Sequence, residues 1–113
     1  KSKIQGTMSY IPPEQIRGEI VDGRADIYSL GCMFFEMVGG KMPYTGVNAN
    51  ELLNKHLKAP IPSLVSVNEN VTPEFTKLVA RMMAKRPDER PASTADIHAE
   101  LDEIRVYCRG TAS

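Results

Sequence analysis

The sequence predicts a mainly α-helical fold in a single domain, with no substantial sheet. One reason is that apolar residues recur at helical spacing along residues 73–85, and another is that residues 26–38 are apolar on every side of a helix. The alternation of apolar and polar residues that marks half-buried strands is rare. The 113 residues, of which 42% are hydrophobic and 25% charged, suit one globular domain or a large piece of one.

The charge of the chain limits the classes of binding partner, and its cysteines indicate the compartment. Fourteen basic and fourteen acidic side chains give a formal net charge of +0, which carries no signal for nucleic acid or anionic lipid. Cys32 and Cys108 lie far apart, and Cys32 stands in an apolar run, so we expect a buried free thiol and a reducing compartment.

Targeting signals are also missing from the sequence. We find no signal peptide and no apolar stretch near the roughly 20 residues that span a bilayer. We therefore expect a cytoplasmic location. The sequence starts at Lys1 without a methionine, so we also expect it to be a piece of a longer protein.

The chain opens with a stiff segment, GTMSYIPPEQ, at residues 6–15. Pro12 and Pro13 fix their own φ angles and keep the residue before each of them out of the helical region. Glu14 stands where a short helix can begin. Turn signals follow, among them an Asp-Gly pair at residues 22–23, so we expect a linking loop before the next helix.

A central helix is expected over residues 26–38. Its apolar residues cover all sides, which is typical of a helix in the middle of a core, and Gly39 and Gly40 end it. Residues 48–58 predict a shorter, moderately amphipathic helix with His56 on its apolar side. Residues 60–70 contain two prolines and no sustained period, so we expect an ordered loop there.

Two more helices complete the prediction. Thr72 is a good N-cap and Pro73 suits the first position of a helix over residues 73–85. Ser93 is expected to cap a last helix over residues 94–106. The residues from 108 to 113 look like a tail or linker.

Motifs for metal, phosphate or covalent chemistry are missing. His56 and His98 are isolated from cysteines at ligand spacing, which disfavours a zinc site. No G-x-x-x-x-G-K-[ST] loop is present, and no serine lies in a G-x-S-x-G context. We expect no metal site and no catalytic residue within these 113 residues.

Four motifs in order resemble the second half of the catalytic domain of a Ser/Thr protein kinase. They are GTMSYIPPE, DIYSLGCMFFEM, MPYTG and ARMMAKRPDERPAS. Pro-Pro-Glu stands where the family has the A-P-E triplet that ends the activation segment, with Pro in place of Ala. The resemblance covers Lys1 to Val106. Within the family, the sequence is most like the bacterial, eukaryotic-like branch. It implies a helical fragment of the large, C-terminal lobe over residues 1–107, in which residues 1–15 end the activation segment.

The resemblance assigns substrate-binding roles near the start of the chain. It implies that Gly6, Thr7 and Tyr10 belong to the P+1 loop, which receives the residue after the phosphorylation site. The hydroxyl of Thr7 is expected to support the catalytic loop and to favour Ser/Thr substrates. Ser2 is a candidate phosphorylation site, although a solvated serine in a charged terminus is the plainer reading.

Three further residues receive structural roles from the resemblance. Glu14 is expected to form a largely buried ion pair with Arg90. Asp26 matches the aspartate that accepts backbone N–H bonds from the catalytic loop. A plain N-terminal role for Asp26 in its own helix stays open, because an acid at that end is favoured by the helix macrodipole.

The chemistry of the kinase reaction lies in motifs that this sequence lacks. The Gly-rich loop, the strand lysine, the H-R-D-x-x-x-x-N loop and the metal-binding aspartate all precede the A-P-E position. The resemblance therefore implies a parent kinase that uses ATP and Mg²⁺ to phosphorylate Ser/Thr of protein substrates. The chain alone is expected to be inactive and to bind neither cofactor.

Other readings and partners stay open. The parent can be a pseudokinase or scaffold, and an unrelated helical interaction module is a third reading. We expect the chain to pair with the upstream half of the kinase domain. Without that half, part of residues 27–38 is left uncovered and self-association is expected. A membrane anchor can lie beyond the chain.

Overall fold

The computed structural model describes residues 8–108 and is built from helices. Within that range there is no strand, and a single isolated antiparallel bridge joins Val71 and Tyr107. The mainly α-helical fold class is thus confirmed. The helices are α2 (Pro13–Ile16), α3 (Gly23–Gly39), α4 (Ala49–Lys58), α5 (Leu64–Val67), α6 (Pro73–Met82), the 3-10 turn η1 (Pro87–Glu89) and α7 (Thr94–Glu103).

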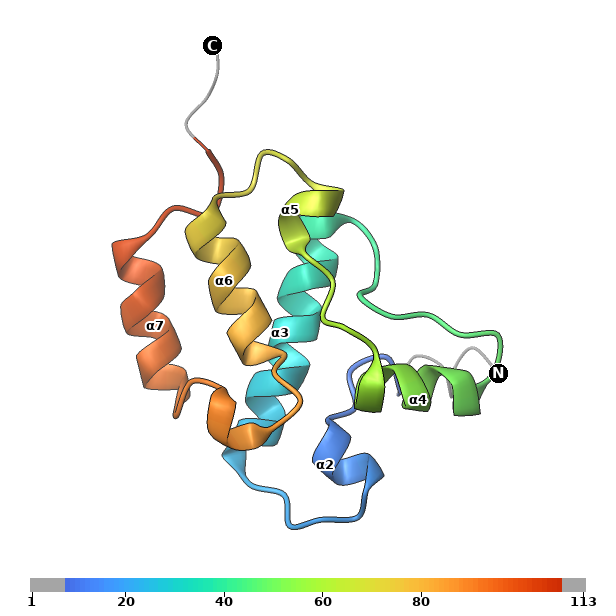
Figure 1. Ribbon diagram of the computed structural model, residues 1–113. Coiled ribbons are helices and arrows are strands. Elements are labelled where there is room, and N and C mark those ends of the chain that lie inside the picture. Colours follow the sequence, from blue (N-terminus) through green and yellow to red (C-terminus); the bar gives the residue numbers. More distant parts are fainter. Residues whose placement is uncertain (1–7, 109–113) are drawn as a thin grey trace.

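Helix α3 is the centre of the arrangement (Figure 1). Helix α6 packs along it, α5 covers its C-terminal end, and α7 lies beyond α6. On the other side, α4 packs against the short helix α2 near the start of the described chain. The core has two buried clusters, one that joins α3 and α6 to α4 and α5, and one between α3, α6 and α7. Its largest fully buried side chains include Tyr28, Phe35, Leu52, Leu78 and Met82.

Helix α3 begins at Gly23, three residues before the expected start at residue 26. The reason is Asp22, whose side chain accepts a hydrogen bond from the backbone N–H of Arg24 at 2.9 Å and so caps the helix. The helix ends at Gly39, and the next residue, Gly40, has a φ of 83° in the left-handed region that suits glycine. The Asp-Gly turn signal of the sequence therefore marks a helix start.

The later helices end earlier than expected. Helix α6 stops at Met82 instead of residue 85, and the carbonyls of Ala84 and Lys85 accept hydrogen bonds from the side chain of Arg90 instead of continuing the helix. Helix α7 stops at Glu103 instead of residue 106. There the chain turns away to pair with the start of α6, since the backbone N–H of Thr72 donates to the carbonyl of Val106 at 2.9 Å.

Two further boundaries differ slightly. Asn48 is the N-cap of α4, since its side chain accepts from the backbone N–H of Glu51 at 2.9 Å, so the helix begins at Ala49. The expected loop over residues 60–70 contains the single-turn helix α5, whose residue Leu64 is buried against the core. Burial of one apolar side chain thus orders a segment without helical periodicity.

Gly31 is the point of closest approach between α3 and α6. A Cβ added at Gly31 would lie 2.8 Å from the Cβ of Met82 and 3.0 Å from the Cγ of Met83. We expect Gly31→Val to lower the free energy of unfolding by about 1–3 kcal/mol through overpacking. Urea unfolding of both proteins measures the change.

Gly23 supplies the matched control for this prediction. A Cβ added at Gly23 meets nothing within 4 Å, and the residue begins a helix. Gly23→Ala should therefore be neutral or stabilise by about 0.4–1 kcal/mol. Equal urea midpoints for wild type and Gly31→Val would contradict the close packing of α3 on α6.

The two cysteines differ in reactivity. Cys32 is fully buried, and burial raises the pKa of its thiol to about 12, whereas Cys108 is exposed. Only the thiolate is a nucleophile, so we expect a thiol reagent to modify Cys108 in the native protein and Cys32 only after unfolding. Mass spectrometry of alkylated protein checks this, with Cys108→Ser as the control that should remain unmodified when folded.

Candidate functional site

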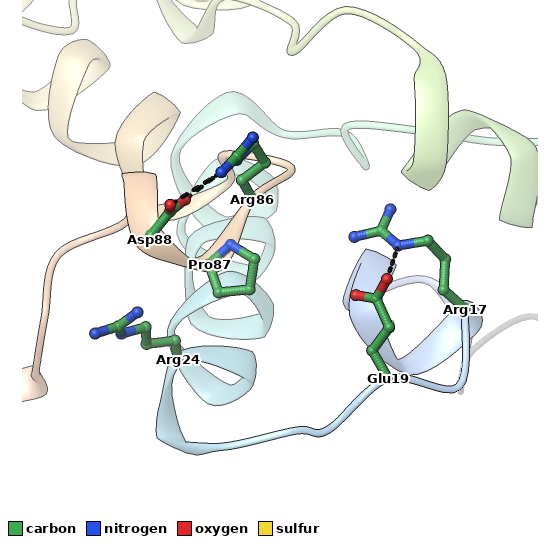
Figure 2. A pocket seen from close by; sticks show the side chains of 6 residues that line it. All are labelled: Arg17, Glu19, Arg24, Arg86, Pro87 and Asp88. Carbon is green, nitrogen blue, oxygen red and sulfur yellow. Dashed lines mark hydrogen bonds and ion pairs between the residues drawn. The ribbon is translucent and has the colours of Figure 1, made fainter.

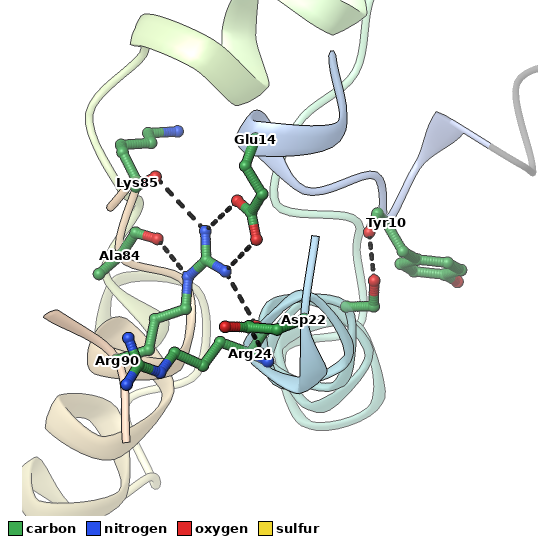
Figure 3. Close-up of polar contacts among 8 residues, drawn as sticks. Tyr10, Glu14, Asp22, Arg24, Ala84, Lys85 and Arg90 are labelled. Carbon is green, nitrogen blue, oxygen red and sulfur yellow. Dashed lines mark hydrogen bonds and ion pairs between the residues drawn. The ribbon is translucent and has the colours of Figure 1, made fainter. Parts of the chain in front are cut away.

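The candidate site is the segment Met8–Glu14 and the residues that hold it against α3, α4 and the connection from α6 to α7. Of the expected substrate-binding residues, Tyr10 lies in this segment. Gly6 and Thr7, and the candidate phosphorylation site Ser2, lie outside the described residues. Figure 3 shows the polar contacts that fasten the segment.

Glu14 and Arg90 form a buried, two-pronged ion pair. The guanidinium donates from Nη1 and Nη2 to the two carboxylate oxygens of Glu14, at 2.8 Å each. Both residues are almost inaccessible, with 1% of Glu14 and 5% of Arg90 exposed. The pair joins residues that are 76 positions apart in sequence.

Arg90 also binds three main-chain carbonyls. Its Nε donates to Ala84 at 2.8 Å, its Nη1 to Arg24 at 2.9 Å, and its Nη2 to Lys85 at 3.3 Å. With the two bonds to Glu14, these contacts use all five N–H donors of a guanidinium. Arg90 therefore ties α2, the start of α3 and the α6–α7 connection into one junction.

The charge of Glu14 is stabilised at this junction. Burial by itself raises the pKa of the carboxyl, but the hydrogen bonds from Arg90 and the positive charges of Arg90 and Arg17 lower it below its ordinary value. Glu14 is thus ionised at neutral pH despite its burial. The guanidinium of Arg90 in turn lies 5.0 Å from the centre of the Tyr28 ring.

Tyr10 is fastened to α3 at two points. Its hydroxyl donates to the carboxylate of Glu36, and its carbonyl accepts from the hydroxyl of Ser29 at 2.6 Å. The hydrogen bond to Glu36, together with burial, raises the pKa of Tyr10. Next to it, Ser9 is buried and its hydroxyl donates to the sulfur of Met42 at 3.4 Å. The first part of the segment is therefore held in one position.

A second buried polar network lies beneath the segment, and sequence reasoning missed it. The hydroxyl of Tyr28 and Nδ1 of His56 are 2.7 Å apart, and the ring centre of Tyr44 is 5.1 Å from that of His56. Lys85 donates from Nζ to the Tyr44 hydroxyl at 2.9 Å. The one local signal was the position of His56 on the apolar side of its helix, one turn after Leu52.

Lys85 closes the C-terminal end of α4. Its Nζ donates to the carbonyls of Lys55 at 3.1 Å and His56 at 2.8 Å, which lie in the last turn of the helix. Burial lowers the pKa of Lys85 to about 8. The ammonium thus stabilises the helix end at neutral pH and places a positive charge next to the imidazole.

Asp26 lies in the first turn of α3 and is exposed. Its carboxylate has no hydrogen-bond partner within residues 8–108. The cap of α3 is Asp22, so capping does not account for Asp26. A shallow pocket of about 330 Å³ lies beside it. The pocket is lined by Gly23, Asp26, Ile27, Ala92, Ser93 and Thr94.

A polar cleft of about 440 Å³ lies between the residues that follow α2, the start of α3 and the turn η1 (Figure 2). Inside it, Arg17 pairs with Glu19 at 3.0 Å and Arg86 pairs with Asp88 at 3.1 Å. Its lining residues are Arg17, Glu19, Arg24, Arg86, Pro87 and Asp88. Two of its three arginines are already paired, and none of the residues expected at the site lines it.

Across residues 8–108, no group of three or more His, Cys, Asp or Glu side chains is placed to hold a metal ion. No helix in the same range has the length and apolar composition needed to cross a membrane.

Comparisons with known proteins agree with the sequence motifs. Residues 1–101 match the family described as protein kinase domain. Serine/threonine-protein kinase PknB of Mycolicibacterium smegmatis is 40% identical over 105 residues, which are 92% of this chain and 16% of that protein. PknL of Mycobacterium tuberculosis is 37% identical over 101 residues, which are 89% of this chain and 25% of that protein.

The chain therefore spans a quarter or less of the length of these relatives. PknB of Mycobacterium tuberculosis is similar as well, with 36% identity over 105 residues. The resemblance to bacterial Ser/Thr kinases that the four motifs indicated is confirmed. This chain belongs to the protein kinase domain family.

Proposed function

We propose that the chain is part of the large lobe of a kinase that transfers the γ-phosphate of ATP, with Mg²⁺, to Ser or Thr of protein substrates. In this proposal the segment around Met8–Tyr10 is the end of the substrate-binding P+1 loop. The observation that carries it is the junction of Glu14 and Arg90, which is buried and uses every donor of the guanidinium.

The fastening of Tyr10 supports a role for the residues before it. Gly6 and Thr7 directly precede the segment that Ser29 and Glu36 tie to α3. A loop that binds a peptide gains affinity when its bound conformation is already held in the free protein. The tethers of Tyr10 supply that preorganisation at the end of the loop.

The exposed carboxylate of Asp26 supports the proposal that the chain pairs with an upstream half of the kinase domain. Its accepting oxygens are free for backbone N–H groups of a catalytic loop from the upstream half of the domain. ATP and Mg²⁺ are proposed to bind in that upstream half, since the motifs that hold them precede this chain in the family. The 113 residues alone should then transfer no phosphate.

One experiment tests the proposal. The chain with its natural upstream kinase sequence is incubated with radiolabelled ATP, Mg²⁺ and a generic protein substrate, and the 113-residue chain is assayed in parallel. We expect phosphoserine and phosphothreonine with the longer protein and none with the chain alone. Absence of transfer by the longer protein would favour a scaffold, and transfer by the chain alone would contradict the proposed division of roles.

The chain without its upstream half is further proposed to self-associate. Met33 and Met37 on α3 are 42% and 74% exposed, so part of the central helix is uncovered. Exposed apolar surface of this kind is commonly buried by association. Sedimentation of the 113-residue chain should therefore show dimers or larger species, and a compact monomer at all concentrations would contradict this.

A further inference from the structure

His56 holds a buried polar atom without a partner. The residue is 0% exposed, and its Nε2 is the single buried side-chain nitrogen or oxygen in the described part of the chain that makes no hydrogen bond. Such atoms are rare because an unsatisfied buried polar group costs free energy. A buried polar atom of this kind, close to a candidate binding segment, indicates a functional role.

The orientation of the imidazole is set by its neighbours. Tyr28 contacts Nδ1 at 2.7 Å, and the rings of Tyr28 and Tyr44 pack edge-on against the imidazole. The ammonium of Lys85 lies close by and disfavours a positive charge on the ring. A neutral imidazole that accepts from the Tyr28 hydroxyl at Nδ1 carries its proton on Nε2.

The candidate substrate segment packs against the same tyrosines as His56. Met8 packs against the core cluster that contains Tyr28 and Tyr44, and Ser9 is buried. The backbone groups of Met8 and Ser9 raise the pKa of His56, against the larger opposite effects of burial and of Lys85. Carbonyl oxygens favour a protonated ring in this way, whereas N–H groups would disfavour it.

We propose that His56 is a positioning residue for the substrate-binding segment, with its Nε2–H directed at the main-chain carbonyls of Met8 and Ser9. The proposal rests on the kinase function proposed above. A donor on α4 that is directed at these carbonyls holds the main chain directly after Thr7, and so holds the loop for the peptide. Lys85 supports this contact in two ways. Its ammonium binds the carbonyls at the C-terminal end of α4, and its positive charge keeps the imidazole neutral.

Steady-state kinetics of the complete kinase domain with a peptide substrate test the proposal. The amide of His56→Gln places an N–H group near the position of Nε2, whereas the amide of His56→Asn lies near the position of Nδ1. We expect His56→Asn to raise KM for the peptide about 3- to 10-fold, the equivalent of one hydrogen bond. His56→Gln should stay within about twofold of wild type, and KM for ATP should not change.

The control is the same substitution at His98, whose side chain is 80% exposed on α7. His98→Asn should leave KM for the peptide unchanged. Equal increases of KM in His56→Asn and His56→Gln, or an equal increase of KM for ATP, would show that the imidazole only fills space. Either result would overturn the proposal.

Nitrogen-15 NMR of the imidazole in the wild-type domain gives a readout independent of activity and of the stability of the variants. His56→Gln identifies the signals. We expect the neutral Nε2–H tautomer between pH 5.5 and 8, and the Nδ1–H tautomer would overturn the proposal. If wild type phosphorylates no protein, the kinase function fails, whereas the tautomer still reports whether Nε2 carries the proton that a contact with the segment requires.

Discussion

Replacing Arg90 with methionine is expected to lower the free energy of unfolding by about 3–5 kcal/mol. The change strands the carboxylate of Glu14, which is 1% exposed and loses both of its 2.8 Å hydrogen bonds to the guanidinium. It also leaves the carbonyls of Ala84, Lys85 and Arg24 without their common donor. Urea unfolding at pH 7 measures the loss.

An exposed ion pair of the same length is the control. Arg81 donates to Glu100 at 2.8 Å, but the two side chains are 48% and 38% exposed. Arg81→Met should therefore cost no more than about 1 kcal/mol. If the two substitutions had the same effect, burial would not be what makes the junction strong.

The pH dependence of Arg90→Met gives a second check. In wild type the lowered pKa of Glu14 contributes stability that is present above its unfolded value and is lost as the pH falls through the folded value. Without Arg90, the effect of burial dominates and raises the pKa of Glu14. Protonation then removes the unpaired buried charge. The stability difference between wild type and variant should shrink on acidification, and a constant difference would count against this explanation.

Acidification is expected to destabilise the protein by about 3 kcal/mol through His56 alone. Burial and the positive charge of Lys85 lower the pKa of the imidazole from 6.5 to about 4, although the backbone of Met8 and Ser9 offsets part of this. Between these values the unfolded chain binds a proton at His56 that the folded chain does not. Stability therefore falls as the pH drops from 6.5 to 4.

His56→Gln isolates this contribution. The variant cannot take up the proton, so its free energy of unfolding should fall less steeply than that of wild type between pH 6.5 and 4. Other groups near His56 are Tyr28, Tyr44 and Lys85, and these do not change charge in this range. The control His98→Gln, at an exposed position, should leave the contribution of His56 in place. Parallel curves for wild type and His56→Gln would contradict the burial of a neutral imidazole.

Local patterns in the sequence predicted the helical fold and several helix starts. Thr72 caps α6 with Pro73 at its first position, and Ser93 caps α7, as predicted. These features depend on contacts within a few residues, which a linear sequence displays directly. The order of four short motifs also identified the kinase family, because this order can be read directly from the sequence.

The helix ends and the buried polar networks could not be predicted from local sequence patterns. Helix α7 ends at Glu103 because the chain beyond it pairs with Thr72, which lies 33 residues before Arg105. The contact of Tyr28 with His56 spans 28 residues, and no local pattern encodes it. Such pairs form only when packing brings distant segments together.

The sequence by itself therefore determined the fold class, the family and the helix starts that rest on neighbouring residues. The pairing of Glu14 with Arg90 was expected only from the resemblance, and the structure supplies its burial and its three added carbonyls. Only the tertiary structure decided that His56 is buried and that burial and Lys85 lower the pKa of its imidazole. The physical reason is that burial and charge at His56 depend on α3, α4 and Lys85 together, three parts of the chain that meet only in the folded protein.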